Sequence, residues 1–395
     1  MGALDGIRVL DLGLLIQGPQ AAAMLGDMGA DVVKIELPGF GDQSRWIPAS
    51  MTDRRGPFFH SVNRGKRSVT VDLRTPLGRE ILLRLAETAD VVISNFKPGT
   101  MDDWGLSYDD VAARNPRVVY ATGSAFGPVG PDALREGADI AGQAAGGLIS
   151  TTGRDGETPS PVGVTIADHI ASQNMVAGIL AALFTRERTG RGQRVDVSLV
   201  GGQIWAQAAE FTSVFLTGQQ PERSNHGHGL IPMIYGILQT ADGWIAMVGV
   251  PIPLKPAFFR AIGREDLLEV PRFQAPIFPP GDRQALFAEL TPTFRSKTTA
   301  EWMEILRAAG QRFAPVRDYL AVAGDEQNWV NGYFTEVEHP EWGTTRVVGT
   351  PIRMSETPLE PGEYAPELGQ HTEEVLLEAG FAWEDLEGFR NAKAI

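Results

Sequence analysis

The sequence predicts an α/β protein whose first 200 residues form a parallel sheet covered by helices. Short runs of Val, Ile and Leu, typical of buried strands, alternate with stretches of helical periodicity. Gly (45) and Pro (27) are abundant, which indicates many turns and suits alternating strands and helices better than a helical bundle. Strands separated by helices of this length pair in parallel, and ligands bind where such strands end and the topology reverses.

Each element of this first half has its own signal. The expected strands are 8–13, 31–36, 68–73, 90–94, 118–122 and 194–199, which are short apolar or alternating runs. A helix is expected at 19–29, since Pro19 suits a first helical turn and Gly29 a helix end. Another is expected at 75–88. A longer helix follows Asp168, because apolar residues recur at helical spacing at Met175, Val176, Ile179, Leu180, Leu183 and Phe184.

The composition changes after about residue 215. The stretch 219–229 is polar and rich in glycine, which is typical of a loop or linker. A smaller α+β unit is expected to follow, with a strand at 244–250 and helices at 254–262, 283–293 and 299–309. A loop-rich stretch covers 325–363, and a final helix opens after Gly369.

Composition excludes several classes of function. A formal net charge of -14 argues against nucleic acid or an anionic membrane surface as a partner. The absence of cysteine excludes disulfides, thiolate catalysis and Cys-ligated metals. The N-terminus has no signal-peptide pattern, and no apolar run reaches the ~18–20 residues of a spanning helix. We therefore expect a cytoplasmic protein.

Two short motifs carry little chemistry alone. The turn Gly13–Pro19 lacks G-x-G-x-x-G, so a nicotinamide or flavin dinucleotide is not expected, and there is no Walker A loop. Gln17-Gly18-Pro19 either presents an amide and a helix N-terminus to a polar ligand or forms only a turn before a helix. His226-Gly227-His228 has no third ligand at suitable spacing, which favours a flexible loop over a metal site.

Charged residues leave two further alternatives open. Arg54, Arg55, Arg64, Lys66 and Arg67 form a basic cluster, with Lys97 beyond the strand at 90–94. Such residues are either solvated surface or, gathered at strand ends, a phosphate site. Asp168 opens a helix, where an aspartate is either an N-cap or a nucleophile whose ionisation the helix end favours.

Several segments in order identify a family. They are Val9–Gly13, Gln17–Pro19, Gly29–Glu36, Asn63–Ser68, Asn95–Gly99, Ala167-Asp168, Gly178–Leu183, Thr189–Gln193, His339-Pro340 and Pro366–Thr372. Together they resemble the class III CoA-transferases, the family of formyl-CoA transferase and carnitine CoA-transferase, over nearly the whole chain.

The resemblance implies a fold and a set of partners. It implies a Rossmann-like large domain and a smaller α+β domain in a ring-shaped subunit, with two subunits interlaced as a homodimer. The N-terminal part of the CoA-binding large domain would be 1–215, the small domain with its linkers 216–330, and the linker and C-terminal return 331–395. The substrates would be an acyl-CoA and a carboxylic acid, with no permanently bound cofactor.

The resemblance also implies site residues and a mechanism. Asp168 matches the family's catalytic aspartate and Gln17 its active-site glutamine. The expected CoA contacts are Asn95, Phe96, Lys97, Arg67, Leu73 and Arg135. Asp168 would attack the thioester, forming an aspartyl anhydride and then an aspartyl-CoA thioester, and the helix N-terminus would favour its charged form.

Related acyl-CoA racemases present an alternative. They use a histidine in a Gly-His-Asp-Ile motif, whereas the chain has Gly137-Ala138-Asp139-Ile140, and alanine cannot transfer a proton. The racemase glutamate falls near Ile252. The glycine-rich lid of formyl-CoA transferase is replaced by Gly249–Pro253, which prolines stiffen. Transfer is thus favoured over racemisation, while hydrolysis or CoA binding without catalysis stay open. Trp205, Phe211, Met233 and Tyr235 are either acyl-pocket or core residues.

Overall fold

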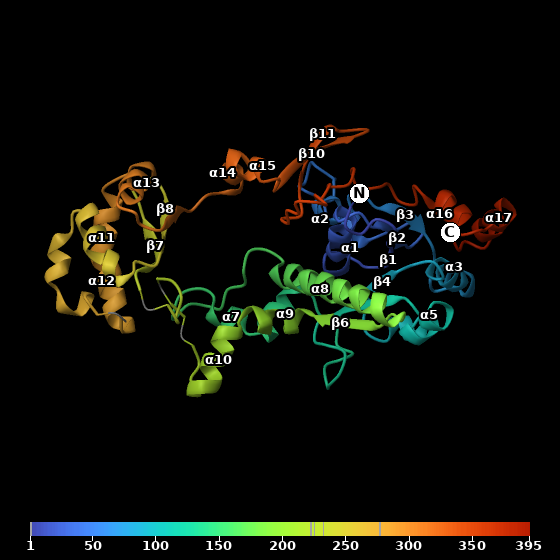
Figure 1. The fold of residues 1–395 in the computed structure, drawn as a ribbon, viewed down its shortest axis with the longest axis horizontal. Helices are drawn as coiled ribbons and strands as arrows, with labels where there is room; N and C mark the ends of the chain where they lie inside the picture. Colours follow the sequence, from blue (N-terminus) through green and yellow to red (C-terminus); the bar gives the residue numbers. More distant parts are fainter. Residues whose placement is uncertain (1, 222, 225, 232, 276–277) are drawn as a thin grey trace. The chain divides into compact units, whose positions relative to one another are not determined.

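The computed structural model describes residues 2–221, 223–224, 226–231, 233–275 and 278–395. The chain forms two compact units (Figure 1). Unit 1 comprises Met1–Gly147, Gly163–Ala206 and Glu326–Ile395, and unit 2 comprises Leu148–Val162 and Gln207–Asp325.

Unit 1 is built on a six-stranded sheet in which every pairing is parallel. The strands, in the order β3-β2-β1-β4-β5-β6, are β1 (Arg8–Asp11), β2 (Asp31–Glu36), β3 (Arg67–Thr70), β4 (Val91–Ser94), β5 (Val119–Ser124) and β6 (Arg194–Ser198). The predicted parallel sheet is confirmed. The strand order reverses between β1 and β4, and the segments that follow these two strands flank the position where α/β sheets bind ligands.

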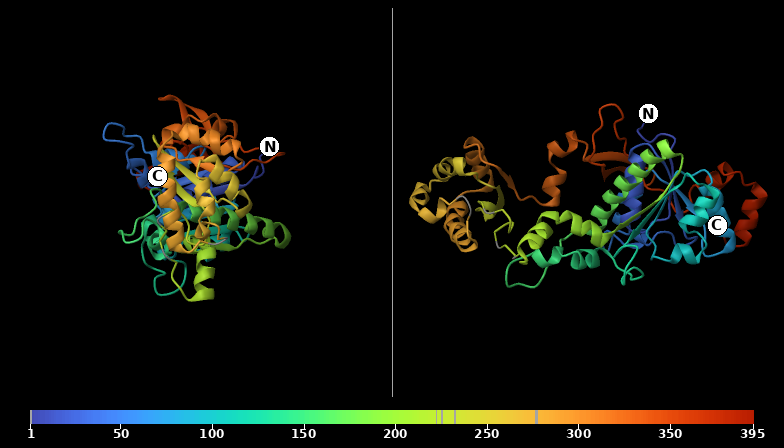
Figure 2. Two further views of the ribbon diagram at one scale, coloured as in Figure 1. Left: turned by 90° about the vertical axis from the view of Figure 1, so that its left-hand side faces the viewer. Right: turned by 60° about the horizontal axis from the view of Figure 1, so that its bottom comes forward.

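Helices cover both faces of this sheet (Figure 2). Side chains alternate along each strand, so Val9 and Val32 face one layer while Leu10 and Val33 face the other. The first layer contains α1 (Gln17–Asp27) and α8 (Ile166–Thr189). The second contains α3 (Pro76–Ala86), α5 (Tyr108–Arg114), α16 (Thr372–Glu378) and α17 (Trp383–Asn391).

The pairing of α1 with α8 brings two helix beginnings together. The contact face of α1 carries fully buried alanines, Ala21 and Ala22, whose small side chains allow a close approach. The facing side of α8 contributes Met175 and Ile179, which are also fully buried. Gly190, in a left-handed conformation (φ 71°), ends α8.

The C-terminal segment attaches to the edge strand β3. The backbone N–H of Ser68 donates to Nδ1 of His371 (3.1 Å), and that of Thr70 donates to the hydroxyl of Thr372 (3.0 Å). A third backbone bond joins Asp72 to Ala394 (2.8 Å). Residues about 300 positions apart in the sequence are thereby held in one unit.

Unit 2 has a three-stranded antiparallel sheet packed against helices. The strands are β7 (Tyr235–Gln239), β8 (Trp244–Val248) and β9 (Phe313–Pro315), and the helices are α11 (Lys255–Ala261), α12 (Pro280–Arg295) and α13 (Thr299–Ala308). Phenylalanines and Trp302 fill the core between them. The expected strand at 244–250 and the three expected helices are confirmed with shifted ends.

The expectation of a loop-rich stretch at 325–363 was partly wrong. It contains an antiparallel hairpin in unit 1, β10 (Phe334–His339) and β11 (Gly343–Val348). β11 is mostly exposed, β10 buries only His339, and both strands are rich in polar residues, so they lack the apolar alternation that predicts a strand. The other helical elements are η1 (Gln43–Trp46), α2 (Pro57–Val62), α4 (Thr100–Asp103), α6 (Asp139–Ala145), α7 (Leu148–Thr151), α9 (Leu199–Ala206), α10 (Ala208–Thr217), η2 (Ile252–Leu254), η3 (Glu265–Glu269), η4 (Pro271–Phe273), α14 (Tyr319–Ala323) and α15 (Glu326–Val330).

The described residues contain neither a cluster suited to a metal ion nor a helix suited to cross a membrane. No cluster of three or more His, Cys, Asp or Glu side chains there could hold a metal ion. His226 instead stacks on Phe287, with ring centroids 4.6 Å apart, and Nε2 of His228 lies 2.9 Å from the carboxylate of Glu210. No helix in the same part of the chain is long and apolar enough to cross a membrane.

Candidate active site

The segments after β1 and β4 hold one another at the reversal of strand order. Asn95 accepts a hydrogen bond from the backbone N–H of Leu14 (2.7 Å) and donates one to the carbonyl of Leu14 (2.9 Å). Leu15 adopts a left-handed conformation (φ 61°), and its N–H donates to the carboxylate of Asp42 (3.2 Å). The turn is therefore fixed from two sides, and α1 begins immediately after it at Gln17.

The side chain of Gln17 lies over β5. It is only 4% exposed, and its Nε2 lies 3.4 Å from the carbonyl oxygen of Ser124. Gly123 leaves the space that the amide occupies, because a Cβ at this position would lie 2.4 Å from Oε1 of Gln17. The amide is thus confined at the carboxyl end of the sheet.

Asp168 lies in the first turn of α8, next to the beginning of α1. The hydroxyl of Ser172, one helical turn later, lies 2.8 Å from the carbonyl oxygens of both Asp168 and Gln17. Nδ1 of His169 lies 2.6 Å from the side-chain oxygen of Gln20. These contacts place the beginnings of α1 and α8, and with them the backbones of Gln17 and Asp168, next to each other.

Asp139 takes the capping role at this helix end. One carboxylate oxygen accepts from the backbone N–H of Ala167 (2.7 Å), and the other accepts from Nε2 of Gln143 (2.6 Å). The N-cap position itself belongs to Thr165, whose side chain makes no capping hydrogen bond. The N-cap alternative for Asp168 is therefore wrong. Its carboxylate accepts no hydrogen bond from any residue that the structure describes.

The environment of Asp168 favours its neutral form. Burial, and secondarily the negative charge of Asp139, raise its pKa to about 7. The expectation that the helix end would favour the charged form was wrong, because desolvation dominates and Asp139 receives the available N–H group. A carboxylate that is partly dehydrated and free of hydrogen bonds is a stronger nucleophile than a solvated one.

Most of the basic cluster at 54–67 is engaged in ion pairs. Buried Lys66 donates to the carboxylate of Asp11 (2.7 Å), the carbonyl of Pro19 (2.8 Å) and the side chain of Asn63 (2.9 Å). Arg64 is buried against Asp27, and Arg55 pairs with Asp53. A phosphate site made by Arg64 and Lys66 is therefore excluded, since both side chains stabilise the fold instead.

The expected CoA contacts fall into two groups. Phe96 packs edge-on against Trp104 (5.4 Å between centroids), and Lys97 pairs with Glu136 at 3.2 Å with half its side chain exposed. The guanidinium of Arg135 lies 4.6 Å from the ring of Phe126. These residues and Asn95 follow the carboxyl ends of β4 and β5.

Arg67 and Leu73 are placed differently. Arg67 lies at the amino end of β3, where it pairs with Asp31 (2.7 Å) and Glu378 (2.9 Å). Leu73 is buried in the core on the α3 side of the sheet. The position of Arg67 gives no support to a role in binding CoA.

Sequence reasoning missed the residues that shape the site. Asp139 was considered only as part of a racemase motif, although its carboxylate sets the charge environment of Asp168. Ser172 carried a usable signal, because it follows Asp168 by four residues and so lies on the same helix face. Gly123 carried no signal in the sequence. Its role, to leave space for the Gln17 side chain, is evident only from the short distance between the two residues in the structure.

Comparison with known proteins identifies the family of the chain. The profile of CoA-transferase family III matches residues 4–372. The chain is 36% identical to succinyl-CoA:mesaconate CoA-transferase of Haloarcula marismortui (96% of this chain, 97% of that one). It is 30% identical to succinyl-CoA:glutarate CoA-transferase of Mus musculus (96% and 86%).

A solved structure is also similar over its full length. It is that of a CAIB/BAIF family protein from Brucella suis, with a TM-score of 0.86 and 31% identity, covering 96% of this chain and 99% of that one. The match of the profile across the chain and the similarity to named CoA-transferases show the family. The protein is thus an enzyme that belongs to CoA-transferase family III.

Proposed function

We propose that the protein moves CoA from an acyl-CoA donor to a carboxylic acid acceptor, with Asp168 as the nucleophile. The observation that carries this proposal is the Asp168 carboxylate itself. It is largely buried, accepts no hydrogen bond from the described residues, and lies in the first turn of α8, where the hydroxyl of Ser172 contacts the backbone carbonyls of both Asp168 and Gln17. Such a group is available for attack on a carbonyl carbon.

The first half of the reaction transfers CoA to the enzyme. A carboxylate oxygen of Asp168 attacks the thioester carbonyl carbon of the donor, the C–S bond breaks, and CoA leaves as the thiolate. The product is a mixed anhydride between Asp168 and the donor acyl group. The thiolate then attacks the aspartyl carbonyl carbon, which releases the donor carboxylate and leaves an Asp168–CoA thioester.

The second half reverses these steps with the acceptor. The acceptor carboxylate attacks the aspartyl thioester, releases CoA thiolate and forms a second anhydride. The thiolate attacks the acceptor acyl carbon, which yields the new acyl-CoA and regenerates the Asp168 carboxylate. No net proton is consumed. We propose that the amide of Gln17, which lies at the carboxyl end of β5, donates to the oxyanions that form in these steps.

Both substrates are inferred from chemistry and similarity. The mesaconate and glutarate enzymes act with succinyl-CoA and a dicarboxylic acid, which supports a dicarboxylic acceptor and a succinyl-type donor here. CoA serves as substrate, with no permanently bound cofactor. Asn95, Phe96, Lys97 and Arg135 are proposed to line the CoA site, because they gather beyond the carboxyl ends of β4 and β5.

The active assembly is proposed to be an interlaced homodimer of ring-shaped subunits. Large apolar side chains are exposed in both units: Trp205 (73%) in unit 1, and Phe215 (81%) and Leu320 (85%) in unit 2. α10 has no buried residue. Apolar side chains of this size and exposure need cover from another protein surface. Light scattering of the purified protein tests the dimer.

Trapping of the intermediate tests the mechanism. The protein is incubated with succinyl-CoA and hydroxylamine, digested, and analysed by mass spectrometry. A hydroxamate on Asp168 supports the anhydride or aspartyl thioester. Transfer of CoA by a correctly folded Asp168→Ala variant at the wild-type rate would refute it. Deuterium exchange at the α-carbon without an acceptor would point to the racemase alternative, which Ala138 disfavours.

A further inference from the structure

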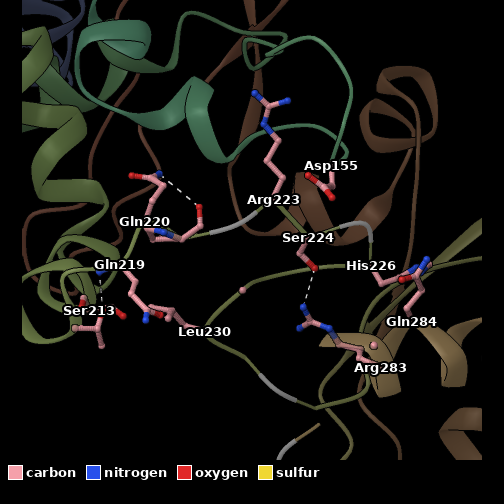
Figure 3. A pocket seen from close by; sticks show the side chains of 14 residues that line it. Asp155, Ser213, Gln219, Gln220, Arg223, Ser224, His226, Leu230, Arg283 and Gln284 are labelled. Atoms are coloured by element: carbon pink, nitrogen blue, oxygen red, sulfur yellow. Dashed lines mark hydrogen bonds between the residues drawn. The ribbon is translucent and has the colours of Figure 1, made fainter. Parts of the chain in front are cut away.

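A polar cavity lies within unit 2 and takes no part in the chemistry proposed for Asp168. Its volume is about 360 Å³, which falls in the range of small-molecule sites. Its walls are formed by Asp155, by some of the described residues between 213 and 230, and by Gly281, Arg283 and Gln284. Figure 3 shows hydroxyl, amide and guanidinium groups around it.

The most unusual group in this wall is the guanidinium of Arg283. The residue is only 8% exposed, yet its hydrogen bonds go to neutral groups: the carbonyls of His228 (2.9 Å) and Ile231 (3.1 Å) and the hydroxyl of Ser224 (3.0 Å). Among the described residues, no carboxylate lies within ion-pair distance of it. A buried cation without a counter-ion is costly, which favours an anion at this position.

The remaining donors of Arg283 are available for such an anion. A guanidinium carries five N–H groups, and the three bonds above use two on Nη1 and one on Nη2. Within the described part of the chain, Nε and the second N–H of Nη2 have no acceptor. Two adjacent N–H groups of this kind match the two oxygens of a carboxylate.

Neighbouring groups add to the positive character of the cavity. Arg223 extends toward segment 148–162 and donates to the carbonyls of Ser150 (3.0 Å) and Glu157 (2.6 Å), again without an ion pair in the described residues (Figure 3). Burial, Arg283 and Arg154 lower the pKa of His226, as expected in positive surroundings. Asp155 is the acidic side chain of the described lining.

We propose that this cavity binds a small organic anion through a carboxylate, with Arg283 and Ser224 as direct contacts. The amides of Gln219, Gln220 and Gln284 line the same space and suit the polar remainder of such a ligand. The alternative role of Arg283 is structural, since its bonds hold Ser224, His228 and Ile231 against α12. The two roles differ in whether an added anion binds.

Calorimetric titration of the full-length Asp168→Ala protein distinguishes the binding role of Arg283 from the structural one. In this variant, binding is measured in the absence of turnover. The probes are succinate, glutarate and inorganic phosphate, each titrated separately. We expect the dicarboxylates to bind and phosphate to bind more weakly. Arg283→Leu should weaken dicarboxylate binding roughly tenfold or more, since it removes hydrogen bonds to a charged group. Tighter binding of phosphate than of either dicarboxylate would overturn the choice of a carboxylate.

Matched variants keep the test decisive. Arg264→Leu removes another arginine of unit 2, one that pairs with Asp266 and Glu289 outside the cavity, and should leave binding unchanged. Gln284→Leu alters the exposed wall without removing the bonds of Arg283, and should weaken binding even if Arg283→Leu does not fold. Absence of binding by the Asp168→Ala protein, or an affinity in the folded Arg283→Leu and Gln284→Leu proteins equal to that of the Asp168→Ala parent, would overturn the proposal. The transfer activity of the wild-type protein tests the proposed function of Asp168 independently of this cavity.

Discussion

Asp139 caps the helix that carries Asp168 and also raises the pKa of Asp168. Its carboxylate accepts the N–H of Ala167, the residue before Asp168, at 2.7 Å. Its negative charge adds to the effect of burial, and the pKa of Asp168 reaches about 7. One side chain thus contributes to the position of the proposed nucleophile and to its charge.

Transfer activity should depend on the ionisation of Asp168. Because its pKa is about 7, kcat/KM for acyl transfer should rise between pH 6 and pH 8 as the carboxylate ionises. The profile is measured with a saturating acceptor and varied acyl-CoA. A rate that is flat over this range would contradict the assignment of Asp168 as an ionising nucleophile.

Asp139→Asn should shift that profile to lower pH. Asparagine retains an oxygen to accept the N–H of Ala167 but removes the charge that raises the pKa of Asp168. The larger effect, burial, remains, so the midpoint should stay above the ordinary value for aspartate. Asp109→Asn, on the exposed side of α5, serves as the control and should leave the midpoint unchanged. The same measurement of kcat/KM against pH applies.

Asp168→Asn should stabilise the protein at alkaline pH. The folded pKa of Asp168 is raised, so the folded state binds more protons than the unfolded state between about pH 4 and pH 7. Its contribution to stability is therefore greatest below that window and is lost as the pH rises through it. After allowance for partial exposure, the gain at pH 8 should be on the order of 1 to 3 kcal/mol. Denaturant unfolding at pH 8 and pH 4 checks this, and an equal difference at both would contradict it.

Gly123→Ala should impair transfer without unfolding the sheet. A Cβ at this position would lie 2.4 Å from Oε1 of Gln17, and a flexible amide can move aside. Loss of one oxyanion donor costs roughly a hundredfold or more in kcat. Gly123→Ala should therefore resemble Gln17→Ala, and the double variant should be no worse than either single one. Gly388→Ala, where an added Cβ meets nothing within 4 Å, is the matched control.

Asn95→Ala should lower kcat more than it raises KM for CoA. Asn95 makes two hydrogen bonds to Leu14 in the turn that leads to Gln17. Their loss should cost about 1 to 3 kcal/mol of stability and loosen the position of Gln17. A rise in KM with kcat unchanged would show that contact with CoA is instead its main contribution.

Local patterns were sufficient to predict most of the fold but less of the site. Apolar runs and helical spacing identified the six strands of the sheet, α8, and the helices of unit 2. They missed β10 and β11, because strands rich in polar residues carry no apolar alternation. The basic cluster at 54–67 was ambiguous, since sequence cannot distinguish a lysine at the surface from Lys66, buried against Asp11.

The sequence by itself determined the α/β class, the family resemblance and the candidate nucleophile, because these depend on residue type and spacing along the chain. The tertiary structure alone decided the environment of Asp168. Asp139 and Gln17 lie 29 and 151 residues away from it in the chain, and only folding brings their charges, donors and shielding from water to the same place. A pKa depends on that shielding and on nearby charge, so the carboxylate that the sequence offered as a cap or a nucleophile has its pKa raised to about 7 by burial and by Asp139.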